Sequence, residues 1–218
     1  MSLQFSDAYT TGFHGADGSA NQLMFRAAIP FMMLERPNIF RITVPYNTSS
    51  LSGADGFGDI TVFDLATFSY SWGRLGVGVV ASLPTGTKGL SAEKWTAGPA
   101  VGFVNSSSKQ FNWGLFAQTL FSYAGDANAP DVGIINLQPI FTYPLGRGRS
   151  LSLGNSALIY DTRKSRWASL LLGVNYGFIV PLAGQKWRPN FEVDYDFRDA
   201  SGNQEWVIRA GITLLLPT

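Results

Sequence analysis

The residue types best suited to acid–base or nucleophilic chemistry lie near the start of the chain, in the segment TTGFHGADGSA. It contains the only histidine, His14, with Asp17 and Ser19 close by. A Ser–His–Asp apparatus needs these groups within hydrogen-bond reach of one another and an oxyanion hole beside them. The same three residue types often occur together by chance in a glycine-rich loop. We therefore interpret His14 as a solvated loop residue, assign no catalytic residue and predict that the chain is not an enzyme.

Oxygen ligands for a metal ion occur in the segment AGDANAPD, which contains Asp126, Asn128 and Asp131. These are the groups that Ca²⁺ prefers, but their spacing matches no established calcium loop. The chain has no cysteine and one histidine, which disfavours zinc. No glycine-rich loop is placed to hold a phosphate. We predict neither a metal nor a cofactor.

Charged residues are arranged most distinctively in WRPNFEVDYDFRD, which runs from Trp187 to Asp199. Every second residue is apolar and mostly aromatic, and the residues between them are polar or charged. A period of two indicates a β-strand, because successive side chains point to opposite faces of a sheet. One face of this strand is therefore apolar and the other is highly charged. The central question is which of the two faces lies on the outer surface of the folded protein.

The composition is unusual for a protein whose whole surface faces water. Charged residues make up 14% of the chain, against about 25% in typical soluble domains. Aromatic residues also make up 14%, and there are 24 glycines. The formal charge is +1 without any charge run, so we expect no nucleic-acid partner. The sequence has no long apolar run that predicts a transmembrane helix. No signal peptide precedes Gln4, so we expect an exported protein to be present here in its mature form.

Segments of period two, bounded by Gly, Pro, Asn, Asp and Ser, recur along the whole chain. They predict strands near 21–32, 38–46, 58–71, 75–84, 95–104, 111–123, 132–143, 149–160, 167–180, 187–198 and 205–216. No linker or low-complexity stretch divides them, so we predict a single domain over residues 1–218.

The connections between these strands alternate between short turns and longer polar loops. This pattern is typical of outer-membrane barrels, which have an even number of antiparallel strands and both termini on the short-turn side. A further strand near Leu3–Thr11 gives twelve strands, which we prefer. The alternative is ten strands, with residues 1–20 plugging the barrel or disordered.

The apolar faces have the marks of a membrane rather than of a soluble core. They contain no charge over about nine to eleven residues, the length that a tilted strand needs to cross a bilayer. Tryptophans lie near strand ends, where aromatic girdles meet the membrane interfaces. We predict these interface aromatic residues to be Trp72, Trp95, Trp113, Trp167, Trp187 and Trp206. The sequence thus predicts an all-β, antiparallel, up-and-down transmembrane β-barrel with its aromatic residues toward lipid.

Several short motifs resemble one known family. They are Gly56–Ile60 (GFGDI), Leu83–Gly86 (LPTG), Trp95–Pro99 (WTAGP), Leu137–Pro139 (LQP) with Tyr143, and the closing strand from Trp206 to Pro217. In this order and spacing, over residues 38–217, they resemble the outer-membrane barrels assigned to transport and to the meta-pathway of phenol degradation. The resemblance implies the fold and an outer-membrane location more than it implies a substrate. The chain departs from such barrels by ending without an aromatic residue.

The charges on the opposite face would line the lumen. We predict this set to be Arg26, Arg41, Arg188, Glu192, Asp194, Asp196, Arg198, Glu205 and Arg209. One interpretation is a network of ion pairs and hydrogen bonds that fills a narrow barrel. The other is a polar lining along which solutes or ions move. The two interpretations are compatible.

From these patterns we predict a channel in the bacterial outer membrane for passive passage of small solutes, with aromatic or hydrophobic compounds among them. Its expected partners are membrane lipid or detergent and the solutes. Two alternatives stay open, an outer-membrane enzyme that acts on lipid at the barrel rim and a soluble β-barrel that binds a ligand. Solubility without detergent would favour the soluble barrel, and loss of an activity in His14→Ala would favour the enzyme.

Overall fold

The protein is an all-β molecule in the computed structural model, which describes residues 1–217. None of these residues forms a helix of the length and hydrophobicity that a membrane crossing requires. The strands are β1 (Ser2–Thr10), β2 (Ala20–Met33), β3 (Arg36–Ser49), β4 (Gly56–Phe57), β5 (Ile60–Tyr70), β6 (Gly73–Leu83), β7 (Lys94–Asn105), β8 (Asn112–Gly125), β9 (Gly133–Gly146), β10 (Arg149–Ser152), β11 (Ala157–Asp161), β12 (Arg166–Phe178), β13 (Val180–Leu182), β14 (Gln185–Asp196) and β15 (Trp206–Leu215).

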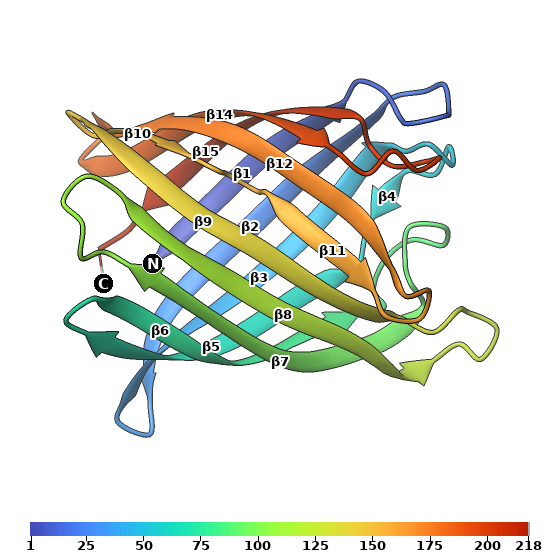
Figure 1. Cartoon of the computed structure of the whole chain (residues 1–218), viewed down its shortest axis with the longest axis horizontal. Helices are drawn as coiled ribbons and strands as arrows, with labels where there is room; N and C mark the ends of the chain where they lie inside the picture. Colours follow the sequence, from blue (N-terminus) through green and yellow to red (C-terminus); the bar gives the residue numbers. More distant parts are fainter. Residues whose placement is uncertain (218) are drawn as a thin grey trace.

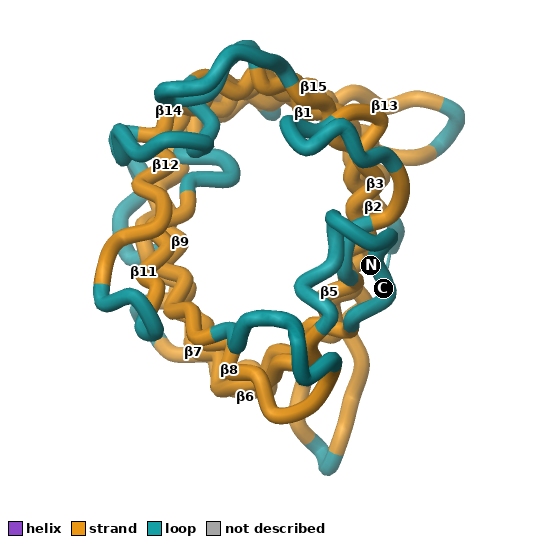
Figure 2. The backbone as a smooth tube through the Cα atoms, turned by 90° about the vertical axis from the view of Figure 1, so that its right-hand side faces the viewer, coloured by secondary structure: helices purple, strands orange, loops and turns teal. Residues whose placement is uncertain are grey.

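The strands form a closed antiparallel barrel (Figures 1 and 2). Closure comes from β1, which pairs with β15 on one side and β2 on the other. β10 and β11 lie one after the other between β9 and β12 and count as one strand of the wall. β13 follows β12 and pairs with the same strand, β14. β4 is a two-residue strand that pairs with β3. The wall therefore has twelve strands. This confirms the prediction of twelve and shows that the ten-strand alternative was wrong.

The two ends of the barrel differ as the loop lengths predicted. The termini lie at the end with tight turns (Figure 1). Three of these turns have two central residues with positive φ, namely Leu34 and Glu35, Arg147 and Gly148, and Ala183 and Gly184. Such turns match the twist of the strands that they join. The longer loops 11–19, 50–59, 84–93, 126–132 and 197–205 gather at the other end.

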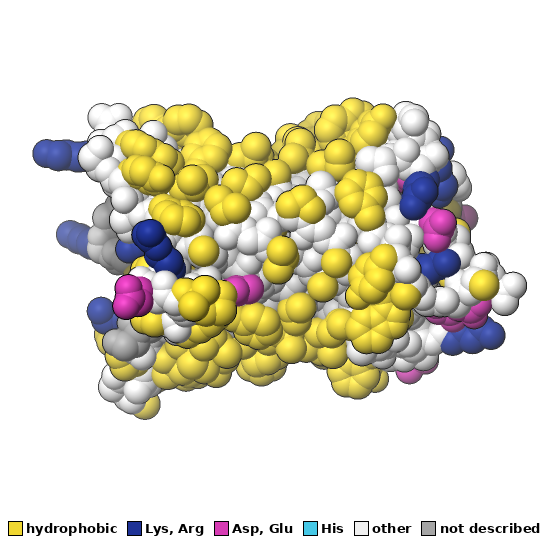
Figure 3. Space-filling view, turned by 90° about the horizontal axis from the view of Figure 1, so that it is seen from below, with side chains coloured by type: hydrophobic (Ala, Val, Ile, Leu, Met, Phe, Trp, Pro, Cys, Tyr) yellow, Lys and Arg dark blue, Asp and Glu magenta, His cyan; other side chains and the backbone are white. Residues whose placement is uncertain are grey.

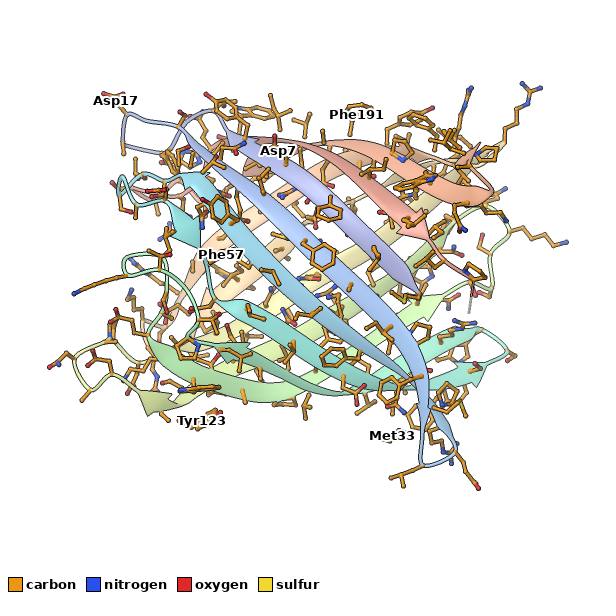
Figure 4. The ribbon with its side chains drawn as sticks, turned by 180° about the vertical axis from the view of Figure 1, so that it is seen from behind. Asp7, Asp17, Met33, Phe57, Tyr123 and Phe191 are labelled. Carbon is orange, nitrogen blue, oxygen red and sulfur yellow. The ribbon has the colours of Figure 1, made fainter. Side chains whose placement is uncertain are left out.

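The period of two separates an apolar outside from a polar inside. Along β14, Phe191 is 60% exposed and Val193 48%, whereas Glu192 and Asp194 between them are 2% and 0% exposed. Apolar side chains cover much of the outer wall, with Lys and Arg near the two ends (Figure 3). Phe191 and Tyr123 point away from the barrel axis (Figure 4). The assignment of the aromatic face to the outside is therefore the one that the fold adopts.

Part of the interior is apolar, on the wall opposite β14. The cluster there consists of Phe63, Leu65, Val80, Ala100 and Phe116. It occupies the space left by glycines on the neighbouring strands. An added Cβ at Gly102 would lie 2.8 Å from the Phe116 ring, and one at Gly76 would lie 3.4 Å from Leu65. The small residues of β6 and β7 thus serve close packing of their larger neighbours.

Two carboxylates lie on the apolar outer face. Asp7 is opposite Leu23 and Ala210, and Asn21 donates a hydrogen bond to it. Figure 4 shows it on β1, between the two ends of the barrel. Asp64 is the second of these carboxylates and lies on β5. The pairing of β5 with β3 and β6 is regular, so Asp64 faces outward in register. One of its carboxyl oxygens is buried without a hydrogen-bond partner among the described residues.

Candidate functional site

The densest group of charges lies on the inner wall where β14 pairs with β15. Glu192 is opposite Arg209 and Asp194 is opposite Val207, so all of these side chains share the inner face. Arg209 Nε lies 3.5 Å from Glu192 Oε1, and Arg209 Nη2 lies 3.4 Å from Asp194 Oδ2. Both carboxylates are fully buried. One guanidinium thus compensates two carboxylates in an interior where an unpaired charge is costly.

Small residues of β12 make room for these charges. An added Cβ at Gly173 would lie 1.8 Å from Asp194 Oδ1, and one at Gly177 would lie 2.6 Å from Arg188 Nη2. Between these glycines, Asn175 donates a 2.7 Å hydrogen bond to Glu192 Oε2. The polar and glycine-rich face of β12 is therefore the complement of the charged face of β14.

A short segment between β10 and β11 folds into the lumen, and it is visible inside the ring of strands in Figure 2. Its central residue, Asn155, donates from its backbone N to Glu192 Oε1 at 2.8 Å and from Nδ2 to both carboxylate oxygens at 3.0 Å. Across the lumen, Arg26 Nη1 on β2 donates to Asn155 Oδ1 at 2.6 Å. Gly154 permits the approach, because its φ is +62° and an added Cβ would lie 2.4 Å from the Glu192 carboxylate.

Asn155 is the residue of this site that sequence reasoning missed. We predicted one continuous strand over 149–160, whereas the strand is interrupted between Ser152 and Ala157. The signal was present in the sequence as Leu153–Ser156 (LGNS), a turn-forming group in the middle of a strand pattern. Its inward direction could not be predicted, because it depends on Glu192 and Arg26 from distant strands.

Three of the predicted lumen charges lie toward the long-loop end. Asp196 accepts hydrogen bonds from Ser169 Oγ at 2.6 Å and from the backbone N of Leu170 at 2.8 Å. Arg198 follows the end of β14, and its Nε donates to the backbone O of Trp167 at 3.0 Å. Glu205 is half-buried and precedes β15. These three residues do not join the cluster around Arg209.

The remaining two predicted lumen charges are arginines. Arg188 lies toward the tight-turn end, where its Nη2 donates to Ser150 Oγ at 3.3 Å. Arg41 lies on β3, with its guanidinium carbon 4.2 Å from the centroid of the Phe63 ring, a cation–π contact. Neither is in an ion pair among residues 1–217.

Two cavities follow one another along the interior. The first has a volume of about 480 Å³ and a polar lining that includes Gln22, Arg26, Asn47 and Asn155. The second has a volume of about 630 Å³ and a mainly apolar lining. Its apolar residues include Ile39, Phe63, Leu65, Phe116 and Ile140. Arg41 and Gln138 line both cavities, so the two meet at these side chains.

The six tryptophans divide between the two ends of the barrel. Trp72, Trp113 and Trp187 lie in or next to connections at the tight-turn end. Trp95, Trp167 and Trp206 lie at or next to strand starts at the long-loop end. Trp95, Trp113, Trp167 and Trp206 are each about two-fifths exposed, and Trp72 and Trp187 are half-buried. Two such rings separated by an apolar wall are the pattern of interface girdles.

The interpretation of His14 as a solvated loop residue was wrong, because its side chain is only 10% exposed. Its contacts also differ from those considered from the sequence. His14 Nε2 lies 2.8 Å from the backbone O of Asp196, and its Nδ1 lies 3.6 Å from the Asp199 carboxylate. No hydrogen bond within residues 1–217 joins His14 to Asp17 or Ser19. Figure 4 shows Asp17 at the tip of the β1–β2 loop.

The two aspartates of the AGDANAPD loop have separate partners. Asp126 accepts from the backbone N of Asn128 at 2.8 Å. Asp131 pairs with Lys94 at 3.2 Å and accepts from Ser122 Oγ at 3.2 Å. The hydrogen bonds from Lys94 and Ser122 hold the pKa of Asp131 below its ordinary value. The described part of the chain contains no group of three or more acidic or histidine side chains that could hold a metal ion.

Comparison with known proteins relates the chain to porins through structure alone. No protein-family model and no curated protein matches the sequence. A solved structure of the NanC porin superposes with a TM-score of 0.72, covering 98% of this chain and 100% of that chain at 12% identity. The chain has the fold of a porin. Two mutants of the porin of Rh. blastica also match, covering 98% of this chain and 97% of theirs at 9% and 8% identity. Their TM-scores of 0.29 and 0.31 are too low to support an argument.

Proposed function

We propose that this chain is a channel of the Gram-negative outer membrane through which small solutes pass passively. The observation that carries the proposal is the pair of interior cavities that meet at Arg41 and Gln138. The porin fold, the apolar outer wall and the two rings of tryptophan support a membrane location. The inward segment around Asn155 narrows the passage, so we expect a low conductance.

We further propose that aromatic or hydrophobic compounds are among the solutes. The second cavity supports this, because Phe63, Phe116 and Ile140 offer apolar contacts inside a barrel whose other wall is charged. A planar ring can stack or pack edge-to-face on phenylalanine rings. The resemblance of the sequence to barrels assigned to phenol degradation leads to the same expectation.

The test is single-channel recording of the refolded protein in a planar bilayer at low and high salt. Asp194 is fully buried against Arg209, so its removal would not report on the passage. The better variant is Arg41→Gln, because the Arg41 side chain lines both cavities. We expect steady conductance in the wild type and a lower preference for anions in the variant. Lys109→Gln, in an exposed turn, is the matched control and should leave selectivity unchanged. A protein that inserts but does not conduct would contradict the proposal.

A further inference from the structure

Two half-buried arginines of the inner wall, Arg26 and Arg41, lack the ion-pair partners that cations inside a protein ordinarily have. Within residues 1–217, no carboxylate lies within 4.0 Å of the guanidinium of Arg26 or Arg41. Arg26 has one hydrogen bond, to the neutral side chain of Asn155, and its Nε is buried without a partner. Arg41 lies over Phe63. A charge taken out of water is normally paired with a group of opposite charge.

The strand register places these two cations near each other. Arg26 is opposite Thr43 and Ala28 is opposite Arg41, so the two arginines are diagonal neighbours on the inner face of β2 and β3. Diagonal pairs on adjacent strands lie within reach of long side chains. Two like charges at this separation repel, and the repulsion is stronger in a low-dielectric interior than in water. An anion between them would relieve it.

The buried acidic residues of strand β14 already have other partners. Glu192 and Asp194 pair with Arg209, and Asn155 and Asn175 donate further hydrogen bonds to Glu192. The fold therefore compensates Arg209 but leaves Arg26 and Arg41 facing the cavity of about 480 Å³. The amides of Gln22, Asn47 and Gln138 also line this cavity. They can donate hydrogen bonds to an anion without adding charge.

The mainly apolar second cavity indicates that the part of the anion away from the arginines is apolar. Arg41 and Gln138 stand at the junction, with polar surroundings on one side and Phe63 and Phe116 on the other. A ligand whose negative group meets the arginines can place its body in the apolar cavity. That cavity, at about 630 Å³, falls in the range of about 300–1,000 Å³ typical of small-molecule sites.

We propose that Arg26 and Arg41 bind the carboxylate of a small organic anion, and that the apolar body of the anion packs against Phe63 and Phe116. The inference rests on the proposed function in one respect, that solutes reach the lumen. The inference adds that the bound solute carries a negative charge, whereas the proposed function does not specify the charge of the solutes. Arg41 is the residue that contacts both parts of the ligand.

Equilibrium binding of benzoate to the refolded protein in a non-ionic detergent tests the site without any need for ion flow. Isothermal titration calorimetry gives the dissociation constant for benzoate, for benzyl alcohol, which has the ring without the charge, and for acetate, which has the charge without the ring. We expect benzoate to bind at least about tenfold more tightly than either, since a charge-assisted hydrogen bond and a buried ring each contribute this much.

The variants Arg41→Gln, Arg41→Lys and Arg188→Gln locate the site. We expect Arg41→Gln to weaken benzoate binding by at least about tenfold, because it removes a charge-assisted hydrogen bond. Arg41→Lys should retain part of the affinity, and it remains informative if the glutamine variant does not fold. Arg188→Gln is the matched control, since it removes an arginine whose side chain bonds to Ser150 and lines a different cavity. It should bind benzoate like the wild type.

Three results would overturn the inference: no saturable binding of benzoate, equal affinity for benzyl alcohol, or equal loss of affinity in Arg41→Gln and Arg188→Gln. These results are separate from the conductance test. A protein that conducts ions but does not bind benzoate refutes the anion site alone, and one that binds benzoate but does not conduct refutes the channel alone.

Discussion

Replacing Arg209 tests most directly whether one guanidinium compensates the two buried carboxylates of the inner wall. It is the cation beside two buried carboxylates, at 3.5 Å from Glu192 and 3.4 Å from Asp194. At an effective dielectric constant near 20, a contact of this length gives an attraction of about 5 kcal/mol. Most of that attraction offsets the cost of taking three charges out of water. In Arg209→Met, which keeps an unbranched apolar side chain as far as the position of Nε and removes the charge, the two carboxylates stay buried and repel each other.

We expect Arg209→Met to lower the free energy of unfolding by about 3–5 kcal/mol, the typical cost of breaking a buried ion pair by removing one partner. The assay is urea unfolding in detergent micelles or lipid vesicles, followed by tryptophan fluorescence. Arg188→Met is the matched control, because Arg188 bonds to the hydroxyl of Ser150. Its loss should cost only about 1 kcal/mol.

A second substitution tests the physical reason for the loss. Adding Asp194→Asn to Arg209→Met removes one of the two uncompensated charges, so it should restore a large part of the stability. The reasoning is refuted if Arg209→Met unfolds with the same free energy as Arg188→Met. It is also refuted if Asp194→Asn destabilises the Arg209→Met protein further, because repulsion between the carboxylates would then not be the cause.

Two other residues give independent predictions. Asp64 places a carboxyl group on the apolar outer wall, opposite Phe40 and Val79. Asp64→Leu should therefore raise stability in lipid vesicles by about 1–2 kcal/mol, and an equal or lower unfolding free energy would contradict a lipid-facing position. For Asp131, the lowered pKa means that its contribution to stability is present above the ordinary pKa of about 4 and is lost as the pH falls through the lowered value. The difference in urea midpoint between wild type and Asp131→Asn should therefore be full at neutral pH and vanish in acid, and a difference that persists in acid would exclude this origin.

The general architecture was predictable because it depends on local patterns. A period of two specifies a strand, and its apolar set specifies which face meets lipid. Turn-forming residues divide the strands, and the alternation of short and long connections separates the two ends of the barrel. The short turn at Arg147 and Gly148 shows this directly, since positive φ at both positions is what a two-residue hairpin needs. The parity rule then required an even number of strands, and the period-two segment near Leu3–Thr11 favoured twelve over ten, but only the structure decided between them.

The site was predictable only in part. The sequence placed Glu192, Asp194 and Arg209 on polar faces, but their pairing depends on the register of β14 with β15. It predicted a uniform strand where the structure has the inward segment of Asn155. It also could not show that Arg41 lies beside Phe63 rather than beside a carboxylate. Each of these facts requires contacts between residues far apart in the chain.

The sequence by itself therefore determined the class of fold, the apolar outside and the set of residues available to the lumen, because these follow from the alternation of neighbouring residues. The tertiary structure alone decided which charges compensate one another. Arg209 meets two carboxylates, whereas Arg26 and Arg41 meet none within residues 1–217. The physical reason is that an ion pair acts over a few ångströms, and only closure and register bring side chains of separate strands within that distance.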